Sequence, residues 1–322
     1  MSKFIKQTKA VMVGHAIGDA LGVPVEFLSR QELRETPVTE MMGYGTFPVP
    51  KGAWSDDTSM SLCALSSLAN GVIDFNEIML NFGKWYYKDE FTPTGEMFDV
   101  GNSCSIAIEN YFENKMPYTE CGETRETAHG NGSLMRIHPF VLYLANLNIP
   151  ETDKIKIVEM ASALTHAHER SKMACGIYAF VLWELLNDAT PASIVVGLNR
   201  ARRYYKGYKE YEVYNERLFK QIANLDSLIG AGAPQIQEDE IKSGGYVVHT
   251  LESVIWCLLT TRTYKECVLK AVNLGDDTDT VGAIAGGLAG ALYGYDSIPE
   301  EWKSDLLKRD YIEQLCEKFC TK

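Results

Sequence analysis

The sequence predicts an all-α fold, with residues 1–322 forming a single compact domain of many helices. Apolar residues recur at the i, i+3, i+4 spacing of a helix in several long segments, whereas strand-like stretches are few and short. A composition of 46% hydrophobic and 23% charged residues is typical of a globular protein and excludes a disordered or collagen-like chain. No linker, repeat or low-complexity tract divides the chain, so we expect one domain.

The predicted helices follow one another along the chain, with proline residues marking many of the turns between them. Helical spacing of apolar residues is clearest in residues 13–21, 60–68, 174–185 and 307–319. Val23–Phe27 and Tyr246–His249 instead have the composition of short strands. Residues 37–55 and 88–102 are predicted to be long loops, and long loops in compact domains often carry function.

Glycines spaced four residues apart form one row in the first predicted helix and another near the C-terminus. The rows consist of Gly14, Gly18 and Gly22, and of Gly282, Gly286, Gly290 and Gly294. In a helix each row lies on one face, and each interior glycine costs about 1 kcal/mol relative to alanine. We interpret both rows as sites of close helix approach, because a residue without Cβ lets a neighbouring backbone come near.

Charge and cysteine content limit the functions that are open to this chain. The net charge is −12, so the clustered Lys and Arg residues that bind duplex nucleic acid are not expected. No run of about 18 apolar residues occurs, which argues against a membrane-spanning helix. The eight cysteines form no CxxC pair, which favours reduced thiols and a cytoplasmic location.

Two acidic clusters that are far apart in the sequence each precede a predicted helix. The first is SDDT at Ser55–Thr58, and the second is DDTDT at Asp276–Thr280. Either cluster alone is explained by helix capping, since Ser, Thr and Asp all stabilise helix N-termini. Together they exceed that need, because one side chain is enough for a cap. Carboxylates packed this densely repel one another unless a positive charge lies among them.

A metal site is predicted if the fold turns the two clusters toward each other. Mg²⁺ is bound by carboxylate and hydroxyl oxygens, and four aspartates nearly balance two divalent cations. The candidate ligands for one or two ions are Ser55, Asp56, Asp57, Asp277, Asp279 and Thr280.

Six motifs of this chain resemble those of the ADP-ribosylglycohydrolase family, which includes dinitrogenase-reductase-activating glycohydrolases and ADP-ribosylhydrolases. They span nearly the whole chain in the family's order: GDALGVPVEF at Gly18–Phe27, WSDDT at Trp54–Thr58, GNGSLMR at Gly130–Arg136, THAH at Thr165–His168, SGGYVVHTLE at Ser243–Glu252 and GDDTDT at Gly275–Thr280. The resemblance implies an all-α fold of that family's type and a centre of two Mg²⁺ or Mn²⁺ ions. It also implies hydrolysis of a bond to the anomeric carbon of ADP-ribose.

The resemblance assigns roles to individual acidic residues. All six candidate ligands match the family's two ligand triplets, although Ser55 stands where threonine is more usual. Asp276 stands where glycine is common, and we interpret it as a solvated neighbour of the site. Glu26 matches a family glutamate that contacts the metals and controls access; from the sequence alone it would be a surface carboxylate. The resemblance implies three catalytic residues, Glu26, Asp57 and Asp99. Asp99 would orient the attacking water, or it merely caps a helix.

The remaining motif residues are candidate substrate contacts. They are Gly101, Gly130, Asn131, Gly132, Ser133, His166 and Tyr246. The 130–133 segment lies along ADP-ribose in the family, but the same residues also suit a turn and a helix cap. The resemblance gives His166 a hydrogen bond to the ribose or phosphate, while His168 is expected to be structural. Tyr246 would cover the adenosine half of the substrate or pack in the protein.

We therefore predict a metal-dependent hydrolase that releases ADP-ribose from an ADP-ribosylated protein side chain or a small conjugate. Carboxylates near the metals would stabilise the oxocarbenium character of the sugar. Family members cleave arginine, serine, poly-ADP-ribose or O-acetyl linkages, and no residue of this sequence chooses among them. Two alternatives stay open: a catalytically silent relative, and a two-metal phosphohydrolase that acts on the diphosphate. The oligomeric state is not predicted.

Overall fold

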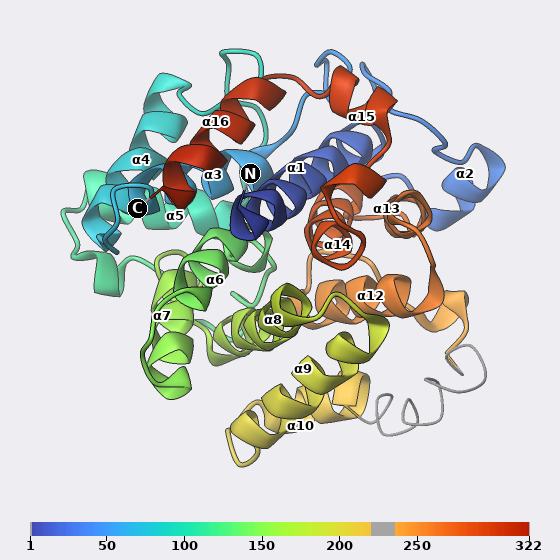
Figure 1. Cartoon of the computed structure of the whole chain (residues 1–322). Helices are drawn as coiled ribbons and strands as arrows, with labels where there is room; N and C mark the ends of the chain where they lie inside the picture. The colour runs from blue at the N-terminus through green and yellow to red at the C-terminus, as the bar shows by residue number, and fades with distance from the viewer. Residues whose placement is uncertain (1, 220–235, 322) are drawn as a thin grey trace.

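The regular structure of the chain is helical, as the computed structural model shows for residues 2–219 and 236–321 (Figure 1). Within these two ranges no β-strand occurs, and the isolated bridges Glu123–His166 and Gly130–Tyr246 are the only β pairing. The all-α prediction is confirmed. The α-helices are α1 (Lys3–Gly22), α2 (Arg30–Glu35), α3 (Asp56–Leu68), α4 (Phe75–Lys88), α5 (Asn102–Phe112), α6 (His138–Ala145), α7 (Glu151–Ala163), α8 (Glu169–Asn187), α9 (Pro191–Tyr205), α10 (Tyr211–Tyr214), α12 (Val247–Thr260), α13 (Tyr264–Val272), α14 (Thr278–Tyr293), α15 (Glu300–Asp305) and α16 (Arg309–Cys320).

Shorter helical turns connect several of these elements. They comprise 3₁₀ segments at Val23–Val25, Tyr118–Glu120, Leu134–Arg136, Glu238–Glu240 and Tyr295–Ser297, and a π-helical segment at Asn215–Phe219. The two predicted long loops are confirmed, because no helix lies between Glu35 and Asp56 or between Lys88 and Asn102.

The two predicted strands are wrong. Val23–Val25 is a 3₁₀ turn that follows α1 directly, and Val247 is the first residue of α12. Each stretch is short and includes a polar residue, Glu26 or His249, and so short a pattern does not distinguish a strand from a helical turn. The final helix also begins at Arg309, so Leu307 precedes it.

The centre of the fold is the pair α1 and α14, whose backbones touch (Figure 1). A Cβ atom on Gly18 would lie 2.0 Å from the carbonyl oxygen of Gly282, and one on Gly286 would lie 2.2 Å from that of Gly14. No side chain fits at these distances, which confirms the interpretation of the glycine rows. Gly294 differs from the others because it ends α14 with a φ of 85°. The close contact fixes the C-terminal end of α1 beside the N-terminal end of α14.

Other helices surround this pair, and one cluster of buried apolar residues extends from Val11 to Phe319. All eight cysteines are free, and only Cys320 among them is not buried. Across residues 2–219 and 236–321, none of the helices has the length and hydropathy that crossing a bilayer requires.

Candidate functional site

The structure brings the two acidic clusters into contact. The hydroxyl of Thr280 donates to Oδ2 of Asp57 at 3.3 Å, although 223 positions separate the two residues. Asp57 lies in the first turn of α3 and Thr280 in the first turn of α14. Two helix N-termini therefore face the same space, with the positive ends of both helix dipoles directed at it.

The first turn of α3 is held by α1. The hydroxyl of Ser55 caps the helix by accepting from the backbone N of Asp57 at 3.3 Å, so the capping interpretation holds for this residue. Asp19 accepts from the backbone N of Ser55 at 2.8 Å and from the backbone N and hydroxyl of Thr58 at 3.0 and 2.6 Å. Burial raises the pKa of Asp19 to about 7 against the effect of these hydrogen bonds. Sequence reasoning missed Asp19; its one signal was an acidic residue inside an apolar helical pattern.

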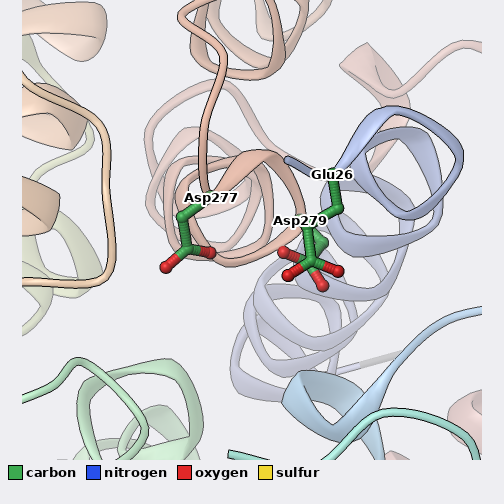
Figure 2. Close-up of side chains that lie close together, drawn as sticks. All are labelled: Glu26, Asp277 and Asp279. Atoms are coloured by element: carbon green, nitrogen blue, oxygen red, sulfur yellow. The ribbon is translucent and has the colours of Figure 1, made fainter. Parts of the chain in front are cut away.

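The first turn of α14 presents its carboxylates differently. Asp277 occupies the N-cap position, but its side chain caps nothing and instead accepts from the amide of Asn131 at 2.8 Å. Capping therefore does not account for Asp277. Asp279 accepts from the backbone N of Thr280 at 2.8 Å. Figure 2 shows Asp277, Asp279 and Glu26 close together, and one carboxylate oxygen from each lies within 4.8 Å of the others.

Glu26 is buried, with 6% of its surface exposed, and the interpretation of a surface carboxylate is wrong. Its Oε2 atom, like Oδ1 of Asp57, is buried without a hydrogen-bond partner among the described residues. Burial, followed by repulsion from Asp99 and the other carboxylates, raises the pKa of Glu26 to about 9. Burial and neighbouring carboxylates also raise the pKa of Asp56, Asp57 and Asp279 well above the usual range.

This donor set fits a hard divalent cation. Its atoms are carboxylate and hydroxyl oxygens, the ligands that Mg²⁺ and Mn²⁺ prefer. A positive charge at this point would give the unpartnered oxygens of Glu26 and Asp57 a partner. It would also reduce the mutual repulsion of the buried carboxylates. Of the six candidate ligands, Asp277 and Asp279 form this close group with Glu26, while Ser55, Asp56, Asp57 and Thr280 lie in the same two turns, and their role as ligands stays a prediction.

A cavity of about 360 Å³ opens onto the acidic cluster. The predicted residues that line it are Glu26, Asp56, Asp99, Gly101, Gly130, Asn131, Gly132, His166, Asp277, Asp279 and Thr280. Phe27, Thr127 and Met135 also line it and were not predicted. Asp276 is exposed on the other side of its turn, as expected for a solvated neighbour.

Two predicted substrate contacts lie away from this cavity. The side chain of Ser133 is fully buried, and its hydroxyl accepts from that of Ser162 at 2.8 Å. The hydroxyl of Ser133 therefore faces the core, and the part that this residue plays in substrate binding stays a prediction. Tyr246 pairs with Gly130 through the backbone, and its ring packs on His129 and His249 with ring centres 4.7 Å apart in both cases.

His166 also lines the cavity. A Cβ atom on Gly132 would lie 2.8 Å from Cε1 of His166, so the ring occupies the space that this glycine leaves. Nδ1 of His166 lies 2.8 Å from the hydroxyl of Thr165, which accepts from Arg136 at 2.7 Å. Burial, with a smaller effect from Arg136, lowers the pKa of His166 to about 3 and keeps the ring neutral. His168 is structural, as expected, because its Nδ1 caps α8 by accepting from the backbone N of Arg170.

Comparison with known proteins gives a consistent result. The family model described as ADP-ribosylglycohydrolase matches residues 2–322. The chain is 33% identical over 321 residues to "ADP-ribosylarginine hydrolase Tri1" of Serratia proteamaculans, covering 99% of this chain and 80% of that protein. It is 31% identical to "ADP-ribosyl-[dinitrogen reductase] glycohydrolase" of Rhodospirillum rubrum, covering 91% and 88%. A solved structure described as "ADP-ribosylglycohydrolase-related protein complex" aligns with a TM-score of 0.76 and 30% identity, covering 99% of this chain and 98% of that chain.

Proposed function

The chain belongs to the ADP-ribosylglycohydrolase family of hydrolases, and from this premise we propose that it releases ADP-ribose from arginine side chains of modified proteins with the help of two divalent cations. The contact between Thr280 and Asp57 carries the proposal, because it joins the ligand oxygens of two distant turns in one site. The arginine acceptor is supported by the similarity to the ADP-ribosylarginine hydrolase of Serratia proteamaculans. An ADP-ribosylated protein would be a transient partner.

The cations would be held by Ser55, Asp56, Asp57, Asp277, Asp279 and Thr280, with Glu26 close by. The unpartnered oxygens of Asp57 and Glu26 support this assignment. Divalent cations supply positive charge and Lewis acidity for the hydroxyl groups of the distal ribose. A hydrolysis assay with each ion distinguishes Mg²⁺ from Mn²⁺.

The carboxylates of the site stabilise the sugar as its bond to the acceptor breaks. Cleavage gives the anomeric carbon oxocarbenium character, and negative groups held in a water-poor cavity stabilise that charge. Asp99 lines the cavity outside the ligand set and would orient the attacking water. Its backbone has a φ of 56°, and such sparsely populated conformations gather at functional sites.

His166 binds the substrate as a neutral hydrogen-bond donor. The hydroxyl of Thr165 accepts from Arg136, so its own proton is available to Nδ1 of His166 at 2.8 Å. The imidazole then carries its proton on Nε2, next to the glycine loop. Gly130, Gly132 and Asn131 would lie along the ribose and diphosphate, and Tyr246 would support this loop from behind through its pairing with Gly130.

We also propose that residues 1–322 act as one domain, since the buried apolar cluster is continuous from Val11 to Phe319. The eight free cysteines suit a reducing compartment, and we propose the cytoplasm.

The proposal is tested by a hydrolysis assay with arginine-, serine- and O-acetyl-linked ADP-ribose, each with Mg²⁺, with Mn²⁺ and with a chelator. We expect ADP-ribose as the product, the highest kcat/KM on the arginine linkage and no turnover with the chelator. Asp57→Asn should abolish turnover, whereas the matched variant Asp276→Asn, on an exposed side chain just before α14, should retain it. Release of AMP, or metal-independent turnover, would contradict the proposal.

A further inference from the structure

Phe27 combines two unfavourable features at the mouth of the cavity. Its side chain is 70% exposed, although large apolar side chains are normally buried, and it takes no part in either hydrophobic cluster. Its backbone has a φ of 67°, a left-handed conformation that is a rare outlier for a bulky residue. The residue lines the cavity directly after Glu26. Packing of the fold explains neither feature.

The backbone around Phe27 is fixed in this strained conformation from two sides. The backbone N of Phe27 donates to the carbonyl oxygen of Asp276 at 2.7 Å, and the backbone N of Asp276 donates to that of Leu28 at 2.8 Å. On the other side, the hydroxyl of Thr46 donates to the carbonyl oxygen of Glu26 at 2.7 Å. A rotation of Phe27 into an ordinary conformation would break the link to the turn that carries Asp277. These hydrogen bonds therefore hold the backbone so that the ring stays exposed at the mouth of the cavity.

The surroundings of the ring select the kind of group that would bind against it. The described lining of the cavity contains the carboxyl groups of Glu26, Asp56, Asp99, Asp277 and Asp279 but no Lys or Arg. Of these, Glu26 and Asp99 lie outside the six proposed metal ligands. An acidic cavity with an exposed aromatic ring at its mouth favours a planar cation, because a guanidinium group stacks on an aromatic face and is attracted by nearby carboxylates.

We propose that Phe27 forms the acceptor subsite, where the guanidinium group of an ADP-ribosylated arginine stacks on the ring while the ADP-ribose occupies the cavity. This inference rests on the proposed function and names the residue that would recognise the arginine. A serine or acetyl acceptor has no planar cation and gains no such contact. Phe27 is thus a specificity residue of the reaction, distinct from the groups that act on the anomeric carbon.

The test compares two substrates across three variants. Phe27→Leu keeps an apolar side chain of similar size but removes the aromatic face, and Phe27→Tyr retains the face. Tyr44→Leu is the matched control, because Tyr44 is 73% exposed with a φ of 59° but does not line the cavity. We expect Phe27→Leu to lower the ratio of kcat/KM for arginine-linked over O-acetyl-linked ADP-ribose about tenfold. Phe27→Tyr and Tyr44→Leu should stay within about threefold of the wild-type ratio.

A kcat/KM ratio that stays at the wild-type value in a folded Phe27→Leu variant would overturn the inference. An equal loss of kcat/KM on both substrates would also overturn it, because it would show that Phe27 only positions Glu26. If one of these results is found while the wild-type protein still cleaves arginine linkages, the proposed function holds and only the role of Phe27 is lost. If the wild-type protein prefers neutral acceptors, the proposed function itself fails. A second measurement needs no variant: methylguanidinium should inhibit the wild-type enzyme about tenfold more strongly than methylammonium, and equal inhibition would contradict stacking.

Discussion

Asp19 accepts two hydrogen bonds from Thr58, one from the backbone N at 3.0 Å and one from the hydroxyl at 2.6 Å. This pair connects the buried face of α1 to the first turn of α3, which carries Asp56 and Asp57. Because α1 also touches α14 through the glycine rows, one helix positions both acidic turns. Asp19 is therefore a positioning residue for the site.

Replacing Asp19 should destabilise the protein and disturb the site together. In Asp19→Asn, one amide NH₂ group would face donors that now bind a carboxylate, leaving a buried donor without an acceptor. We expect a loss of about 1–3 kcal/mol in the free energy of unfolding, measured with urea, and reduced hydrolysis. Asp276→Asn, on an exposed side chain, should change stability by less than about 0.5 kcal/mol. Equal effects of the two variants would contradict the role of Asp19.

Metal binding should be visible as a change in thermal stability. A cation that binds only the folded protein at about 100 times its Kd adds about 2.7 kcal/mol of stability, and it also relieves carboxylate repulsion. We expect Mg²⁺ or Mn²⁺ to raise the Tm of the wild-type protein but not that of Asp279→Asn. Without metal, Asp279→Asn should be more stable than the wild type, because it removes one buried carboxylate from the cluster. A variant that responds to the ions as the wild type does would exclude Asp279 as a ligand.

The metal-free protein should lose stability as the pH rises. The pKa of Glu26 is raised from 4.5 to about 9, so between these values the folded state holds a proton that the unfolded state has released. Stability therefore falls with rising pH, by up to about 1.4 kcal/mol per pH unit for one proton. Urea unfolding in chelator from pH 7 to 9 isolates this effect from His166, whose pKa is lowered to about 3 and whose contribution lies below pH 6.5. Glu26→Gln should have a shallower slope, and an unchanged slope would rule Glu26 out as its source.

The contact between α1 and α14 should not tolerate a methyl group. In an isolated helix, Gly to Ala stabilises by about 1 kcal/mol, but a Cβ atom on Gly18 would lie 2.0 Å from the backbone of Gly282. We expect Gly18→Ala to destabilise the protein by about 3 kcal/mol or more, or to prevent folding. Gly244→Ala, with nothing within 4 Å, is the control and should unfold like the wild type. A stabilised Gly18→Ala variant would show that the helices separate easily.

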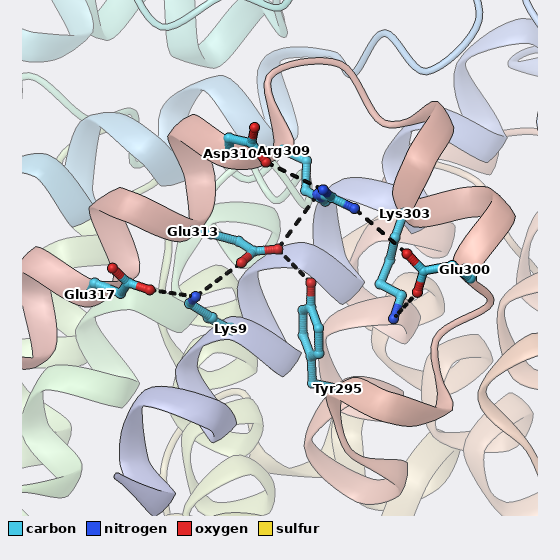
Figure 3. A network of polar contacts seen from close by, with 8 residues as sticks. All are labelled: Lys9, Tyr295, Glu300, Lys303, Arg309, Asp310, Glu313 and Glu317. Carbon is cyan, nitrogen blue, oxygen red and sulfur yellow. Dashed lines mark hydrogen bonds and ion pairs between the residues drawn. The ribbon is translucent and has the colours of Figure 1, made fainter. Parts of the chain in front are cut away.

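The buried side chain of Lys9, with its two ion pairs, should contribute to the attachment of α16. Lys9 on α1 lies 3.0 Å from Glu313 and 2.7 Å from Glu317, and Figure 3 shows Glu313 also accepting from Tyr295. Lys9 is only 5% exposed. Lys9→Ala removes its positive charge and leaves the partly buried carboxylate of Glu313 without this ion-pair partner. We expect a loss of about 1–3 kcal/mol in urea unfolding. Lys156→Ala removes an exposed pair with Asp153 and should cost less than about 1 kcal/mol.

Patterns that depend on near neighbours in the chain were readable from the sequence. The spacing of Val13, Ala16 and Ile17 predicts α1, because side chains three and four positions apart share a helix face whatever surrounds them. The glycine rows likewise predict a close contact, and the two acidic motifs predict ligand chemistry. Even so, the misassigned strand at Val23–Phe27 shows that a mostly apolar stretch of five residues is too short to fix a local conformation.

The sequence by itself determined the helices, the glycine faces and the carboxylate and hydroxyl groups of the two acidic turns, since each depends on residues a few positions apart. Only the tertiary structure decided that Asp19 holds α3, that Glu26 is buried, that Ser133 faces the core and that the ring of Phe27 stands in solvent. The physical reason is that burial and partner choice are set by packing between helices, here across 223 positions from Asp57 to Thr280. The spacing of residues along the chain does not encode that Ser133 faces the core while Asn131 and Asp277 line the cavity.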